Sequence, residues 1–141
     1  NFVKVLMKSI SAFTLLVKDY DEAIAYYTKT LGFILVEDTK IDDKKRWVMI
    51  APSKCSTTKI LLARAANNDQ EKFVGNQSGG RVLLFLETNE FDEDYANFKK
   101  RGVDFQEAPR HEEYGTVVVF KDIYGNKWDL IQTCHKGYRE L

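Results

Sequence analysis

The feature that most constrains the fold of this chain is a repeat, in which one order of strand, helix and further strands occurs twice. In the first half, the β-rich residues 13–17 lead to Asp19, which can cap a helix, and Gly32 ends the helical pattern. In the second half, residues 81–88 are rich in Val, Leu and Phe, and Gly102 again ends a helical pattern. Because the spacing from strand to helix to glycine is nearly the same in both halves, the sequence predicts two copies of one module.

One helix is predicted near the start of each module. Its apolar face is formed by Ala23, Ile24, Tyr27 and Leu31 in the first module and by Phe91, Tyr95 and Phe98 in the second. Asp19, with Glu22 three residues later, has the arrangement of a capping box. Asn89 is the candidate cap of the second helix.

Three strands follow each helix, which makes every module a βαβββ unit. They are predicted at 33–40, 46–51 and 59–63 in the first module and at 103–107, 116–121 and 127–133 in the second. We therefore predict a single α+β domain built from two tandem βαβββ modules, at about 8–64 and 81–135. A polar linker at 65–80, which ends in two glycines, joins them.

Composition excludes several classes of function. The 21 basic residues balance the 21 acidic ones, so no overall field attracts nucleic acid or an anionic membrane. No apolar run approaches the ~20 residues that a membrane span needs, and residues 2–6 lack the cleavage-site pattern of a signal peptide. Cys55 and Cys134 lie far apart without CxxC spacing, which is typical of free thiols in a cytoplasmic protein. A small-molecule partner is the expectation that remains.

Two motifs bracket nearly the whole chain. The first is Val17-Lys18-Asp19-Tyr20-Asp21-Glu22-Ala23, followed by Tyr26-Tyr27 and Leu31-Gly32-Phe33. The second is Phe120-Lys121-Asp122, followed by Tyr124-Gly125-Asn126-Lys127-Trp128-Asp129-Leu130. They resemble the opening and closing elements of the vicinal-oxygen-chelate superfamily of glyoxalases, bleomycin-resistance proteins and extradiol dioxygenases, with Ile123 in place of the usual Pro and Asp129 in place of the usual Glu. The resemblance implies a cup-shaped mixed sheet in which two modules, from one chain or exchanged between two, enclose a pocket.

Metal-using relatives line that pocket with four ligands, and the resemblance identifies the equivalent positions. They are Ala12, Leu61, Arg81 and Asp129. Two of these residues carry no donor atom and one is a permanent cation, so only Asp129 resembles a ligand. His111 and Glu113 resemble a ligand pair only in their spacing, within a loop of solvated charge, and His135 lies near the C-terminus. We therefore predict no metal and no other cofactor.

Strand alternation predicts which side chains face the pocket. They are Ala12, Thr14, Leu16 and Leu61 in the first module and Arg81, Leu83, Phe85, Lys127, Asp129 and Ile131 in the second. Arg81 and Asp129 are the polar exceptions in a wall with much apolar surface. The sequence leaves two readings open: the two residues pair and fill the space of the metal, or Arg81 binds an anionic or carbonyl-bearing ligand through its planar fork.

Further ligand contacts are predicted at the mouth of the pocket. In folds of this kind, loops such as 109–115 border the cavity, so Arg110 and Tyr114 are candidates to close over a ligand. Trp47 is a candidate for an aromatic wall. Analogy with relatives, which cover apolar sheet edges by pairing chains, also predicts a homodimer.

Three functions remain open at this point. The first is metal-free binding of a small molecule between the modules, as in the bleomycin-resistance branch, and it agrees best with the missing ligands. The second is a divalent-metal-dependent lyase, thiol transferase or dioxygenase, which rests on analogy of fold alone. The third is an enzyme without a metal, in which Asp129 or Glu113 accepts a proton near Arg81. We take the first as the prediction; the sequence does not identify the ligand.

Overall fold

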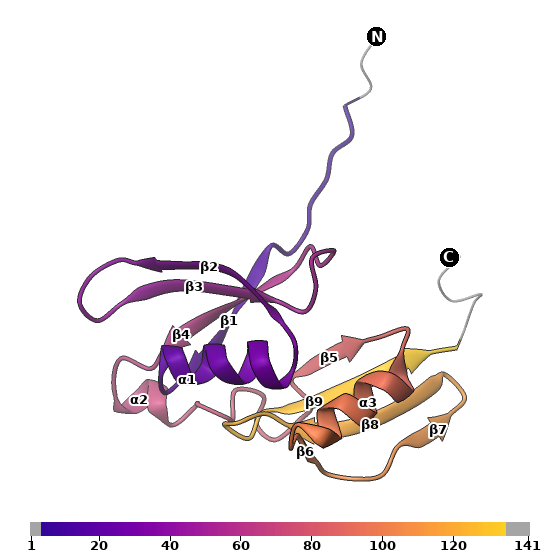
Figure 1. Ribbon diagram of the computed structural model, residues 1–141. Helices are drawn as coiled ribbons and strands as arrows, with labels where there is room; N and C mark the ends of the chain where they lie inside the picture. Colours follow the sequence, from indigo (N-terminus) through magenta and orange to yellow (C-terminus); the bar gives the residue numbers. More distant parts are fainter. Residues whose placement is uncertain (1–3, 135–141) are drawn as a thin grey trace.

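The computed structural model describes residues 4–134, and one order of elements is repeated in it (Figure 1). The first module contains β1 (Ala12–Val17), α1 (Tyr20–Ala25), its π-helical continuation η1 (Tyr26–Thr30), β2 (Ile34–Lys40), β3 (Arg46–Ala51) and β4 (Lys59–Arg64). The second contains β5 (Leu84–Glu87), α3 (Phe91–Lys100), β6 (Asp104–Phe105), β7 (Arg110–Glu112), β8 (Gly115–Lys121) and β9 (Lys127–Thr133). The connecting segment carries a short helix, α2 (Asn68–Glu71). None of the helices within the described range is long and apolar enough to cross a membrane.

The strands form two sheets with the same internal order. The first sheet runs β1-β4-β3-β2 and the second runs β5-β9-β8-β6, with β7 also paired to β8. In each sheet the first strand is parallel to the last (β1 to β4, β5 to β9) and the other pairs are antiparallel. The predicted α+β fold of two mixed-sheet modules is therefore confirmed. Strand β7 is an addition, because a loop was predicted there.

The two helices begin in different ways. Asp19 caps α1 as predicted, since its Oδ2 accepts a hydrogen bond of 2.8 Å from the backbone N–H of Glu22. Asn89 is not the cap of α3, and the prediction was wrong. That helix begins after Glu90, and the Oε1 of Gln132 on β9 accepts from the N–H of Phe91 at 2.9 Å. A side chain distant in sequence thus satisfies the donor that a local cap would have satisfied.

The strand predicted at 81–88 begins only at Leu84. The N–H of Arg81 donates to the carbonyl of Ser78 at 3.4 Å in a turn, and pairing with β9 starts where the N–H of Leu83 donates to the carbonyl of Lys127 at 2.8 Å. The turn, rather than strand alternation, therefore sets the directions of the side chains before β5. As a result Val82 lines a pocket and Leu83 packs against the core, which is the reverse of the prediction.

Both modules contribute to one hydrophobic core. Tyr27 of η1 is fully buried, and its ring lies 5.5 Å from that of Phe33 and 5.9 Å from that of Trp128 on β9. The hydroxyl of Tyr27 donates to the carboxylate of Asp122, in the turn between β8 and β9. Figure 1 shows the helix of the first module between its own sheet and the second module. The helix of one module therefore holds the other module in place.

The free edge of β1 is covered by a side chain. The Oε1 of Gln77 accepts from the N–H of Leu16 at 2.6 Å, and its Nε2 donates to the carbonyl of Thr14 at 3.2 Å. A glutamine amide thus occupies the place of a neighbouring strand at an edge that would otherwise present unpaired backbone groups.

Candidate functional site

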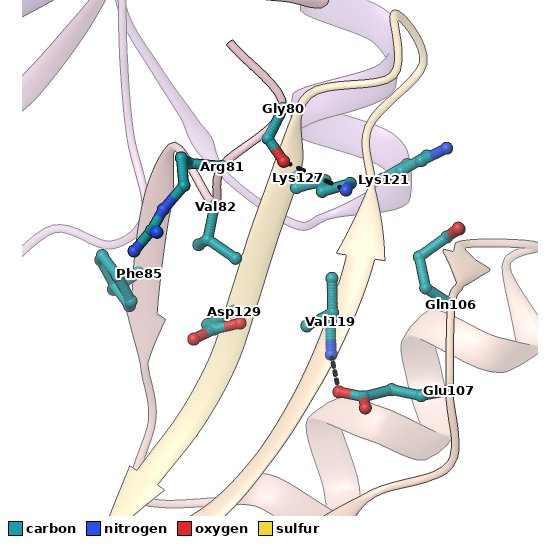
Figure 2. Close-up of a pocket in the computed structure, with 10 residues that line it drawn as sticks. All are labelled: Gly80, Arg81, Val82, Phe85, Gln106, Glu107, Val119, Lys121, Lys127 and Asp129. Atoms are coloured by element: carbon teal, nitrogen blue, oxygen red, sulfur yellow. Dashed lines mark hydrogen bonds between the residues drawn. The ribbon is translucent and has the colours of Figure 1, made fainter. Parts of the chain in front are cut away.

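Two pockets of ligand size are formed in part by side chains of the two sheets. The β9 pocket, with a volume of about 600 Å³, is formed by Gly80, Arg81, Val82, Phe85, Gln106, Glu107, Val119, Lys121, Lys127 and Asp129 (Figure 2). The β1 pocket, with a volume of about 690 Å³, belongs to the first sheet, and Thr14, Trp47 and Leu61 are among its residues. Both volumes fall in the range of small-molecule sites.

Alternation along β9 explains the polar wall of the β9 pocket. Trp128 and Leu130 are buried in the core, so Lys127 and Asp129 point to the opposite face. Val119 of the neighbouring strand β8 pairs with Asp129 in register and contributes apolar surface next to it.

The carboxylate of Asp129 is poorly compensated. Its Oδ1 is buried and has no hydrogen-bond partner in the described chain. Burial raises the pKa of the Asp129 carboxyl above its ordinary value; the positive charge of Arg110 opposes the rise, and the negative charge of Glu107 adds to it. A carboxyl group in this state favours a ligand that offers it a hydrogen-bond donor, since an unpaired buried polar group is costly.

Arg81 and Asp129 line the same pocket without pairing. No ion pair joins them in the part of the chain that the structure describes, and Arg81 is exposed. Figure 2 shows the guanidinium extending along Phe85 rather than toward Asp129. Pairing of Arg81 with Asp129, one of the two readings that the sequence left open, is therefore not found among the described residues, because Arg81 lies in the turn before β5. The reading in which this pair fills the space of a metal has no support from this geometry.

Glu107 is a pocket residue that the sequence analysis missed. Its Oε1 accepts from the Nε of Arg110 at 2.8 Å, and its Oε2 accepts from the N–H of Val119 at 3.0 Å. Arg110 also binds Glu112 at 2.8 Å, and these two carboxylates raise the pKa of its guanidinium. Arg110 is thus fully engaged beside the pocket. The pattern carried no signal for Glu107, since its orientation depends on the pairing of β7 with β8.

The β1 pocket gathers the other predicted residues. Besides Thr14, Trp47 and Leu61 it is lined by Tyr20 and Arg46. The guanidinium of Arg46 lies 5.2 Å from the ring centroid of Tyr20 and forms ion pairs of 2.6 Å with Asp38 and 2.9 Å with Asp21. Its charge is therefore neutralised within the first module.

The structure thus distributes the predicted site residues over two places. Thr14, Trp47 and Leu61 line the β1 pocket, whereas Arg81, Phe85 and Asp129 line the β9 pocket. Arg110 and Tyr114 are described residues that belong to neither lining. The two linings, as the structure describes them, have no residue in common. Within one chain, the modules do not bring the predicted residues into a single pocket.

The residues present do not fit the divalent metal that relatives hold. Ala12 and Leu61 lie on the first sheet, and Arg81 and Asp129 lie at the other pocket. Within residues 4–134 there is no group of three or more His, Cys, Asp or Glu side chains that could hold a metal ion. His111 is exposed on β7, with its Nδ1 3.2 Å from the Oγ1 of Thr116, and His135 lies outside the described residues.

Comparison with known proteins agrees with this fold. A family profile of the glyoxalase/bleomycin resistance protein/dioxygenase superfamily matches residues 9–130. This chain belongs to that superfamily.

Among individual relatives, an uncharacterized protein of Shewanella frigidimarina is 47% identical over 128 residues, which cover 90% of this chain and 95% of that protein. The crystal structure of UcmS2 matches with a TM-score of 0.78 at 26% identity, over 89% of this chain and 98% of that one. TnmS3, an antibiotic binding protein from Streptomyces sp. CB03234, matches with a TM-score of 0.74 at 27% identity, over 93% and 100% of the two chains.

Proposed function

We propose that this protein binds a small organic molecule at the β9 pocket, without the metal of its superfamily. The observation that carries the proposal is a pocket of ligand size that contains an arginine without an ion-pair partner among residues 4–134, a partly buried carboxyl group and the exposed ring of Phe85. The likeness to TnmS3, an antibiotic binding protein, supports binding as the function. Of the four positions that hold metal ligands in relatives, only Asp129 carries a carboxylate here, which supports binding without a metal.

We also propose that the binding unit is a homodimer. Trp47 at the β1 pocket is 40% exposed and Phe85 at the β9 pocket is 67% exposed, and large exposed apolar side chains are typical of contact surfaces. If a two-fold axis sets the β1 pocket of one chain against the β9 pocket of its partner, the predicted site residues meet in two composite cavities. Sedimentation at micromolar concentration should then show a dimer, and a monomer there would contradict this proposal.

A metal-free enzyme is the second candidate, and the state of Asp129 favours it. A carboxyl group whose pKa is raised by burial can accept or return a proton closer to neutral pH than an ordinary one. Glu113 lines neither pocket, so Asp129 alone would carry this role. In that case an Asp129→Asn variant would still bind its substrate and would release it unchanged.

The exposed free thiols of Cys55 and Cys134 agree with the reducing conditions of the cytoplasm, where we place the protein.

The test of binding is a thermal-shift screen with neutral, anionic and cationic aromatic compounds. Any compound that raises the melting temperature is then titrated against Val119→Trp, in which the new side chain fills the floor of the β9 pocket. Val36→Trp places the same side chain at an exposed position of β2 outside both pockets and is the matched control. We expect saturable binding that Val119→Trp abolishes and Val36→Trp leaves intact. Equal affinity in both variants would refute binding at this pocket.

A further inference from the structure

We infer that the ligand of the β9 pocket is an organic anion with a flat aromatic body, whose charge is held by Arg81 together with the lysine pair Lys121 and Lys127. The inference rests on the proposed function, because it assigns a ligand class to the same pocket. Arg81 alone is compatible with an anionic ligand or with a neutral carbonyl-bearing one, and the inference favours the anion.

The lysine pair is the first observation. Lys121 of β8 and Lys127 of β9 are direct cross-strand partners, and both line the pocket. Like charges directly opposite each other in an antiparallel pair are destabilising. Lys127 donates to the carbonyl of Gly80 at 3.1 Å, which leaves its charge unneutralised. Neither lysine forms an ion pair with a carboxylate of residues 4–134.

The nearby carboxylates do not compensate this charge. Asp122, next to Lys121, is buried on the core side, where it accepts hydrogen bonds from Tyr27, Tyr124 and Asn126. Glu107 is bound by Arg110, a cation that it shares with Glu112. The lining therefore contains three cations and two carboxyl groups. Of the two carboxyl groups, Glu107 is bound by Arg110, and burial disfavours the charged form of Asp129.

Arg81 supplies the directional part of an anion site. It has no ion-pair partner among the described residues, and a guanidinium binds carboxylate, sulfonate or phosphate oxygens through two parallel hydrogen bonds. A neutral carbonyl ligand could use the same fork but would leave the lysine pair uncompensated. The lysine pair therefore favours an anion.

The apolar part of the lining defines the rest of the ligand. Figure 2 shows the ring of Phe85 next to the Arg81 side chain, with Val82 and Val119 nearby. Phe85 is exposed at a position where its ring can stack on a flat ligand, and offset stacking of aromatic rings is favourable. The anionic group would then lie toward Arg81 and the lysines, while the flat body would cover Phe85 and the valines.

Two dyes that share one aromatic body test the inference. 1-Anilinonaphthalene-8-sulfonate carries a sulfonate, and N-phenyl-1-naphthylamine is its neutral counterpart. We expect saturable fluorescence titrations in which the sulfonate binds about tenfold tighter or more, since charge-assisted hydrogen bonds are the stronger ones. Arg81→Ala and Lys127→Ala should each weaken the sulfonate dye several-fold and leave the neutral dye unchanged. Phe85→Ala should weaken both dyes.

The control variant is Lys100→Ala, which removes an exposed lysine from α3, outside the pocket, and should change neither titration. Equal affinity for the two dyes, both lost in Val119→Trp, would overturn the anion inference and leave the proposed binding function intact. If neither dye binds in a way that Val119→Trp abolishes, the inference and the proposed pocket both fail.

Discussion

Removal of the Asp122 carboxylate should destabilise the protein and weaken the contact between its two modules. This side chain is 5% exposed and accepts four hydrogen bonds. Its Oδ1 binds the backbone N–H groups of Tyr124 and Asn126, both at 2.9 Å, and its Oδ2 binds the Nδ2 of Asn126 at 2.8 Å and the hydroxyl of Tyr27. Only the last of these bonds crosses from one module to the other.

The expected magnitude follows from these partners. In Asp122→Ala, the three donors of Tyr27 and Asn126 are left buried without an acceptor, and each costs about 1–1.5 kcal/mol. We therefore expect a loss of about 3–5 kcal/mol, a large share of the ~5–15 kcal/mol that stabilises a typical domain. Tyr27→Phe, which removes one donor and leaves the other three bonds, should cost about 1–2 kcal/mol.

Urea denaturation followed by tryptophan fluorescence measures these losses, because Trp128 is buried against Tyr27. In the double variant Tyr27→Phe with Asp122→Ala, both partners of the hydrogen bond between the modules are removed, so no buried hydroxyl is left without an acceptor. The combined loss of stability should therefore be at least about 1 kcal/mol smaller than the sum of the two single losses. Asp122→Asn keeps Oδ1 and serves if Asp122→Ala does not fold. Ile123→Ala, at the neighbouring exposed position, should change stability by less than about 0.5 kcal/mol. Additive losses, or a cost below 1 kcal/mol for Asp122→Ala, would refute the inter-module role.

Three further predictions follow from the site and the sheet edge. Burial raises the folded-state pKa of Asp129 above its ordinary value, so ionisation of this group destabilises the fold as pH rises. Asp129→Asn should therefore have a higher melting temperature than the wild type at pH 7, and the difference should narrow toward pH 4. A difference in melting temperature that does not depend on pH would contradict this. Gln77→Ala leaves the N–H of Leu16 and the carbonyl of Thr14 without their partner, so it should lower the free energy of unfolding by about 1–2 kcal/mol in urea denaturation and increase self-association in light scattering. An unchanged stability and no added self-association would contradict this role of Gln77. Protein purified without chelators should contain well below one equivalent of zinc, nickel or iron by elemental analysis; near one equivalent, lost in Asp129→Ala, would end the metal-free proposal.

Local pattern was a good guide wherever a residue's surroundings lie close in sequence. Asp19 caps α1, and Gly32 and Gly102 take the left-handed φ values of 74° and 85° that a helix end requires. Leu15 and Val17 are buried while Thr14 is exposed, as alternation on β1 predicts. Caps, helix ends and alternation depend on a few neighbouring residues, so the sequence carries them directly.

The site was less predictable, because its geometry depends on contacts between distant segments. Arg81 was assigned to a strand by composition, but pairing with β9 begins only at Leu83, and the turn at Ser78 directs the arginine away from Asp129. Glu107 faces the β9 pocket because Arg110 and Val119 hold it there. No periodic pattern records such hydrogen bonds.

The sequence by itself determined the repeat and the mixed-sheet modules, since these follow from the order of elements. Only the tertiary structure decided that the predicted contacts separate into two pockets, that Tyr27 meets Asp122 across 95 positions of sequence, and that Gln77 covers the edge of β1. The physical reason is that each of these features joins segments whose relative placement is set by the packing of one module on the other, and no local propensity encodes that packing.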